Sequence, residues 1–153
     1  MSDKHKETLS TGPFHVPAFN PFNQDRLVII LKNPTNKPLE ASAKIDVCPL
    51  PPVDPVSFPF NTAEETFFEF PETVVPAMSC TRIEVVIAPF IRSTLHVTTT
   101  GDYKVCDDIP VCGKLEISVT GGSGIVNAPG LINADPSLFF RYDNFVVCDK
   151  KHD

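Results

Sequence analysis

The chain has 153 residues, a net charge of −6 and a sequence pI near 5.1. This length fits one domain with a sizeable core, and an apolar share of 42% argues against wholesale disorder. The acidic balance disfavours nucleic-acid binding, which requires a basic surface, and for the same reason disfavours attraction to an anionic membrane.

The N-terminal region divides into two segments. Residues 1–12 are charged and small, which predicts a flexible tail. Residues 13–23 form an extended arm, because three prolines keep the backbone out of helices while the side chains between them are apolar. We expect this arm to be an edge strand of its own sandwich or to pack on a neighbouring subunit. The candidates for such a subunit contact are Phe14, Val16, Phe19 and Phe22.

Residues 26–47 carry the clearest pattern in the chain. The segment from Leu27 to Leu31 is apolar at every position, so both of its faces are expected to be covered. Residues 39–47 alternate strictly between apolar and polar side chains, as a strand with one dry face and one wet face requires. Two prolines and two asparagines separate the segments, so we interpret the stretch as a β-hairpin.

Short β-type segments recur along the rest of the chain, without an amphipathic helix longer than a turn. They are residues 66–70, 82–88, 91–100, 103–106, 114–120 and 138–148. This pattern predicts an all-β fold, an antiparallel β-sandwich of seven to nine strands, with immunoglobulin-like topology as first choice and a jelly roll as second. We assign residues 24–148 to the sandwich domain and residues 149–153 to a charged C-terminal tail.

Five cysteines is an odd number, so at least one is expected to be free, metal-bound or paired with another chain. All five lie at the ends of predicted strands, where thiols suit cross-links better than core packing. They are Cys48, Cys80, Cys106, Cys112 and Cys148.

Two interpretations of these cysteines compete. A hairpin would bring Cys106 and Cys112 within the Cα separation of about 5.5 Å that a disulfide requires, although a reduced pair is the alternative. A zinc site could combine this pair with two of the remaining cysteines or with His96. Its spacing is wider than zinc motifs use, so we predict neither a metal nor a cofactor.

No catalytic set is apparent, and we expect the protein not to be an enzyme. His96 alternates with Leu95 and Val97, which predicts a position on the solvent face of a strand. Nucleophile elbows, phosphate-binding loops and His-Glu-x-x-His motifs are missing from the sequence. The acidic pairs Glu64–Glu65 and Asp107–Asp108 are candidates for calcium ligation, but the sequence has no spaced Asp-x-Asp-x-Asp loop, so we interpret them as solvated turns.

A second function hypothesis is a binding module for a carbohydrate or protein ligand. It requires an exposed aromatic patch. The candidates for this patch are Phe58, Phe60, Phe67, Phe68, Tyr103 and Tyr142.

The chain starts with polar residues and lacks an apolar run of signal-peptide length or of the roughly 18 residues that span a membrane. We therefore expect synthesis in a cytoplasm and no membrane insertion.

Residues 26–120 resemble a group of small bacterial proteins. The motifs are Leu-Val-Ile-Ile-Leu-Lys-Asn-Pro-Thr-Asn-Lys-Pro-Leu from Leu27, the Val-Pro-Ala-Met-Ser-Cys lead-in from Val75, and the segment from Ile91 to Val105. They are similar to single immunoglobulin-like or jelly-roll domains of spore-forming Firmicutes, some of them located at the spore surface or its appendages. The resemblance implies a structural, self-assembling homo-oligomer, a filament or layer, without activity.

The resemblance also bears on location and linkage. Spore-surface proteins are made inside a mother cell without a signal peptide and are exposed when that cell lyses, which implies a cell- or spore-surface location, with a cytoplasmic one as the alternative. Appendage subunits carry cysteines in their N-terminal arm, whereas residues 1–23 here contain none. Disulfides between sandwich bodies are the remaining possibility.

Overall fold

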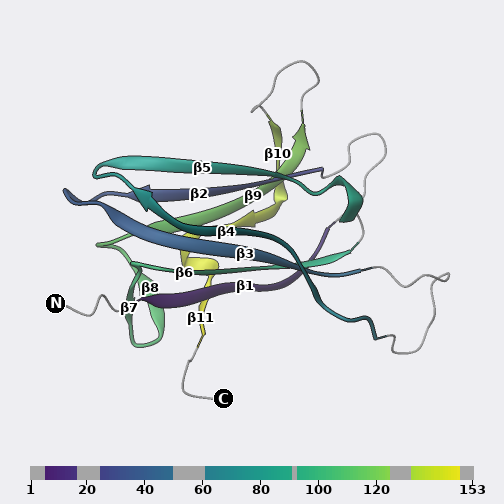
Figure 1. Cartoon of the computed structure of the whole chain (residues 1–153), viewed down its shortest axis with the longest axis horizontal. Helices are drawn as coiled ribbons and strands as arrows, with labels where there is room; N and C mark the ends of the chain where they lie inside the picture. Colours follow the sequence, from purple (N-terminus) through teal and green to yellow (C-terminus); the bar gives the residue numbers. More distant parts are fainter. Residues whose placement is uncertain (1–5, 17–24, 50–60, 91–92, 125–131, 149–153) are drawn as a thin grey trace.

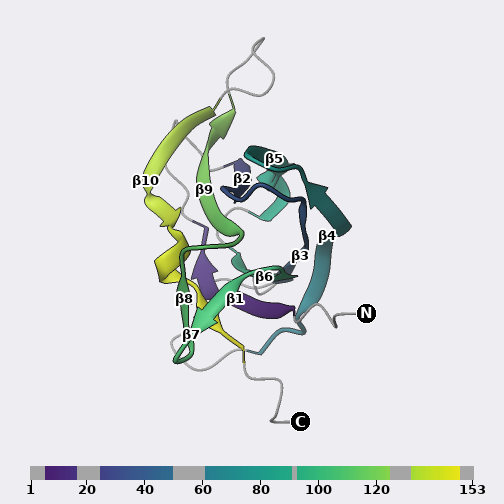
Figure 2. The ribbon, with the colours of Figure 1, turned by 90° about the vertical axis from the view of Figure 1, so that its left-hand side faces the viewer.

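The computed structural model describes residues 6–16, 25–49, 61–90, 93–124 and 132–148. They form two antiparallel β-sheets packed face to face (Figure 1). Seen from the end, one curved layer holds β10, β9, β2 and β5 and the other holds β1, β6, β3 and β4 (Figure 2). The predicted all-β antiparallel sandwich is confirmed.

The described residues contain eleven strands and two short 3-10 turns, which fall into three groups. The five-stranded sheet has the order β11 (Val146–Val147), β1 (Glu7–His15), β6 (Thr94–Gly101), β3 (Leu39–Cys48), β4 (Glu65–Val75). The four-stranded sheet has the order β10 (Ile132–Phe140), β9 (Glu116–Gly124), β2 (Arg26–Asn33), β5 (Ser79–Val86). A separate hairpin joins β7 (Lys104–Cys106) to β8 (Ile109–Val111), and the 3-10 turns are η1 (Ala88–Phe90) and η2 (Tyr142–Asn144).

The hairpin predicted for residues 26–47 is wrong. β2 pairs with β5 and β9, whereas β3 pairs with β4 and β6, so the connection crosses from one sheet to the other. Asn33, which is 1% exposed, explains the crossing. Its Nδ2 atom donates to the carbonyls of Lys37 (2.8 Å), Val75 (2.9 Å) and Pro76 (3.2 Å), so the turn is tied to the β4–β5 connection.

The alternation predicted for β3 is confirmed on the side of the core. Each inward side chain is buried, as a strand facing a packed sheet requires. These residues are Leu39, Ala41, Ala43, Ile45 and Val47. On the other face Lys44 is exposed, but Asp46 is buried, contrary to its predicted place on a wet face.

The flexible tail predicted for residues 1–12 is wrong from Glu7 onward, because Glu7–His15 is strand β1. This strand lies between β11 and β6 and buries Leu9 in the core. The first part of the strand, residues 7–12, looks like a tail in sequence because Leu9 is its one large apolar side chain. Lys6 precedes the strand and forms ion pairs with Asp102 at 2.9 Å and Glu72 at 3.2 Å.

The described part of the predicted arm packs within its own chain. Pro13, Phe14 and His15 continue β1 and pair with β6, and Val16 is buried in the core. The ring of Phe14 lies 4.9 Å from that of Phe140 of β10, which connects the two sheets at this side. Phe19 and Phe22 lie outside the described residues.

Residues 138–148 are predicted to form one closing strand, with a bend at Asp143 and Asn144 as an alternative; the chain does turn there, at η2, but the two parts belong to different sheets. β10 begins at Ile132, η2 interrupts the chain, and β11 then joins the opposite sheet. The side chain of Asn144 accepts a hydrogen bond from the backbone N–H of Arg141 at 2.9 Å, which stabilises the turn at η2. The predicted C-terminal tail, residues 149–153, lies outside the described residues.

Candidate functional site

The cysteines lie at strand ends, as predicted. Cys48 and Cys106 are the last residues of β3 and β7, and Cys80 is the second residue of β5. Cys112 and Cys148 directly follow β8 and β11. Cys80, Cys106 and Cys112 are exposed, and the other two are half-buried. All five thiols are free in this structure.

The proposed disulfide between Cys106 and Cys112 does not form in this structure. Asp107 and Asp108 have φ of 52° and 60°, the left-handed values of a two-residue hairpin turn. This turn places Cys106 opposite Ile109. Cys112 therefore lies beyond the paired residues, at the open end of the hairpin, whereas Cys106 lies next to the turn. Each residue along the strand adds about 3.4 Å to the separation of the two cysteines.

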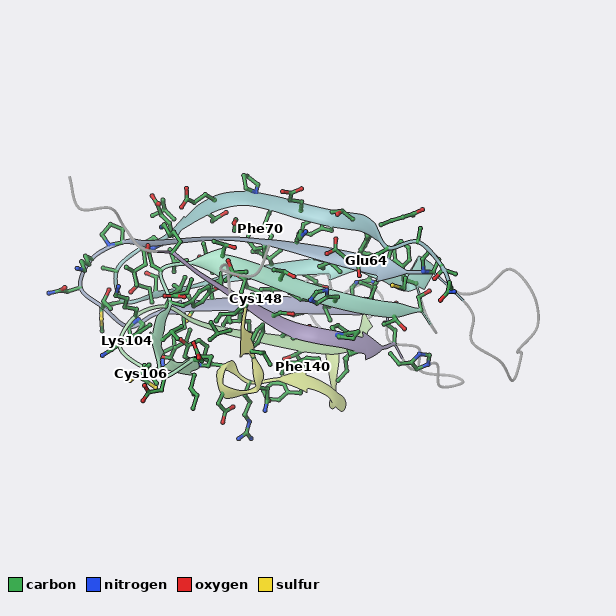
Figure 3. All side chains as sticks on the ribbon, turned by 90° about the horizontal axis from the view of Figure 1, so that it is seen from below. Glu64, Phe70, Lys104, Cys106, Phe140 and Cys148 are labelled. Carbon is green, nitrogen blue, oxygen red and sulfur yellow. The ribbon has the colours of Figure 1, made fainter. Side chains whose placement is uncertain are left out.

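The thiols face different parts of the surface. Figure 3 shows Cys106 at the end of the molecule formed by β7 and β8, and Cys148 nearer the middle. Cys80 lies on β5, an outer strand of the four-stranded sheet, and lines a hollow together with Lys32 and Arg141. Cys80 and Cys106 therefore lie on different elements of the fold.

The outer strand β4 of the five-stranded sheet is poorly suited to strand addition. Glu65, Glu69 and Glu72 are exposed along it, and Pro71 removes one backbone donor. Charges and proline on an edge strand are common means of preventing edge-to-edge pairing. This edge therefore favours contacts through side chains over contacts through a shared ladder.

The predicted exposed aromatic patch is wrong at Tyr103, which is 1% exposed. Its hydroxyl forms a hydrogen bond with the Thr99 hydroxyl at 2.7 Å, which satisfies the buried polar atom. Phe67 is half-buried against Phe90, with ring centroids 4.3 Å apart. Tyr142 is half-buried over the β7–β8 hairpin. Phe58 and Phe60 lie outside the described residues.

His96 lies on the outer face of β6, the face that was predicted. Its direct cross-strand partner is Asp46 of β3. Glu64, the residue before β4, completes a group in which one ligand atom from each side chain lies within 4.8 Å of the others. Imidazole and carboxylate groups at such distances are able to bind a metal ion or exchange a proton.

Sequence reasoning missed Asp46 and Glu64 because their proximity to His96 depends on long-range pairing. No short motif contains the three residues, and the alternation in β3 indicated a solvated Asp46. No signal in the sequence joins them without the register of β3 against β6.

The chain matches no protein-family model, and no curated protein and no solved structure is significantly similar to it. Among the described residues, no helix is long and apolar enough to cross a membrane.

Proposed function

We propose that this protein is a non-enzymatic structural subunit of a self-assembling bacterial surface structure, a fibre or layer, cross-linked by disulfides between sandwich bodies. The observation that carries the proposal is the set of five free cysteines at strand ends, three of them exposed. Each thiol lacks a bonding partner in its own chain, so oxidation would join it to another molecule.

The number and placement of the thiols favour a polymer over a dimer. A subunit with one reactive thiol forms only a disulfide-linked dimer. A subunit with several separated thiols is able to form disulfides with at least two neighbouring subunits. Cys80 on β5 and Cys106 on the β7–β8 hairpin belong to different parts of the fold. Contacts between two unlike patches build an open fibre or layer where the rotation between neighbouring subunits does not close a ring.

The sandwich is suited to this role because its core does not depend on the cysteines. Buried Leu, Ile and Val side chains from both sheets form the core, and no cysteine belongs to it. Oxidation at the rims therefore leaves the packing of the subunit unchanged. The resemblance to spore-surface proteins implies a location in which the thiols are exposed to an oxidant after the mother cell has lysed.

A cross-linking experiment tests the proposal. The reduced chain is exposed to air or to oxidised glutathione and analysed on denaturing gels with and without reductant. We expect a ladder of multimers that reductant converts to monomer. A variant with Cys80, Cys106 and Cys112 replaced by serine should lose most of the ladder, whereas replacement of Cys48 alone should retain it. A chain that stays monomeric under oxidation in both gels would refute the proposal.

A further inference from the structure

We propose that Asp46, Glu64 and His96 form a divalent-metal site with a preference for Zn²⁺ on the outer face of the five-stranded sheet. Their ligand atoms lie within 4.8 Å of one another. Zinc binds imidazole nitrogen and carboxylate oxygen at about 2.0–2.2 Å, so small side-chain rotations bring three such donors onto one ion. This site does not depend on the assembly proposed above.

The backbone register fixes the three side chains. Asp46 and His96 are directly paired across β3 and β6. Asp46 is also paired with Thr66 of β4, two residues after Glu64 in the chain. The ligands therefore come from three neighbouring segments of one sheet.

Neighbouring hydroxyl groups orient two of the ligands. Thr66 donates a hydrogen bond from its hydroxyl to Asp46 Oδ1 at 2.7 Å. Ser10 of β1 forms a hydrogen bond with His96 Nε2 and anchors the ring from the opposite side. Such outer partners are typical of metal-binding carboxylate and imidazole groups, because they fix the direction of the donor atoms.

The burial of Asp46 is the observation that points to a ligand. Its side chain is 5% exposed, although it lies on the outer face of the sheet. Among the described residues, its Oδ2 atom accepts no hydrogen bond, and its ion pair with the half-exposed Lys44 is long, at 3.7 Å. A buried carboxylate oxygen whose charge is balanced only by an ammonium group 3.7 Å away is poorly compensated, and a bound cation would improve that compensation.

A thiol nearby indicates which cation fits. Cys48 Sγ lies 3.9 Å from Glu64 Oε2, so a fourth donor is available at the rim of the site. Calcium and magnesium prefer oxygen ligands alone, whereas zinc accepts nitrogen, oxygen and sulfur together. Asp46 and Cys48 precede the β3–β4 connection and Glu64 follows it, so a bound ion would fasten the two ends of this connection.

The site is spatially separate from the β7–β8 thiols. Figure 3 shows Glu64 toward the opposite end of the molecule from Cys106. A zinc-binding assay on a reduced monomer therefore reports on Asp46, Glu64 and His96 without requiring any cross-link. Failure of either proposal leaves the other standing.

The test is a calorimetric titration of the full reduced chain with ZnCl₂, in a background in which Cys80, Cys106, Cys112 and Cys148 are serine. We expect one ion for each chain, at least tenfold tighter than Mg²⁺ or Ca²⁺, together with an increase in the midpoint of thermal unfolding. The thermal readout shows that the ion binds the folded state.

Matched variants identify the ligands. Glu64→Gln and His96→Gln should each weaken zinc binding at least tenfold, whereas Glu65→Gln and His15→Gln, at exposed neighbouring positions, should leave it unchanged. Glu64 is itself exposed, so its replacement does not threaten the fold. Absence of saturable zinc binding, or equal affinities in the ligand and control variants, would overturn the inference.

Discussion

At the scale of single residues, the side chain of Asn33 connects two turns that are distant in the sequence. Asn33 is the last residue of β2, and its amide group donates to carbonyls from two separate turns. Its Oδ1 atom also accepts from the backbone N–H of Thr35 at 2.9 Å. One side chain thus connects the β2–β3 crossing to the β4–β5 turn and fixes the two sheets at one end.

Replacing Asn33 by alanine should therefore lower the free energy of unfolding by about 2–4 kcal/mol, because buried carbonyls lose their donor. The exposed Asn36 in the same turn provides the control, and its alanine variant should change stability by less than about 0.5 kcal/mol. Urea unfolding of the two variants measures the difference. Equal midpoints would show that the turn does not depend on Asn33.

Tyr142 provides a prediction of pH dependence. Burial raises the pKa of Tyr142 to about 12, and the nearby charges of Glu116 and Cys112 act in the same direction. Its hydroxyl lies 3.2 Å and 3.1 Å from the carbonyls of Lys104 and Val111, to which it can donate while protonated. The unfolded chain ionises near pH 10, before the folded chain does.

The stability contributed by neutral Tyr142 is therefore fully present below about pH 10 and is lost as pH rises from there toward the folded pKa. Urea unfolding between pH 8 and pH 11.5 should show a smaller alkaline loss of stability for Tyr142→Phe than for the unmodified chain. Parallel pH profiles would contradict this account of the Tyr142 environment.

At the scale of elements, β1 is the strand whose importance is least evident from its composition. It pairs with β6 along most of its length and with β11 at Leu9 and Ser10. Its first half lies in the stretch whose charged and small residues predict a tail. Two ladders of the five-stranded sheet depend on it.

Truncation of the N-terminus tests whether residues 7–11, as part of strand β1, contribute to the stability of the fold. Deletion of residues 1–5, which precede β1, should leave cooperative unfolding intact. Deletion of residues 1–11 should abolish it or reduce the thermal midpoint by more than 10 °C, on the order of 2 kcal/mol or more for a domain of this size. Circular dichroism melts measure both. Equal melting of the two truncations would mean that β1 contributes little to the fold.

Features of the fold are predictable from the sequence where they depend only on residues that are close together in the chain. The inward side of β3 follows from alternation alone, and the positions of the cysteines follow from the ends of the strands. The β2–β3 crossing is not predictable from the local pattern, because it involves a hydrogen bond from Asn33 to Val75, which is far along the chain. The proximity of Asp46 and His96 is missed for the same reason, since it depends on the register of distant strands.

At the scale of the whole molecule, the residues that form the core and the cysteines that are proposed to form cross-links lie in different places. The core lies between the sheets, and the free thiols lie at the ends of strands. The charged, proline-containing β4 edge disfavours joining subunits through that strand. Disulfides between side chains are the contacts that the proposed function requires.

Sedimentation velocity and electron microscopy of the native, oxidised chain, each with and without reductant, measure whether disulfides join the subunits. We expect extended high-mass assemblies after oxidation that reductant returns to a folded monomer. A folded monomer in both samples would rule out assembly through disulfides.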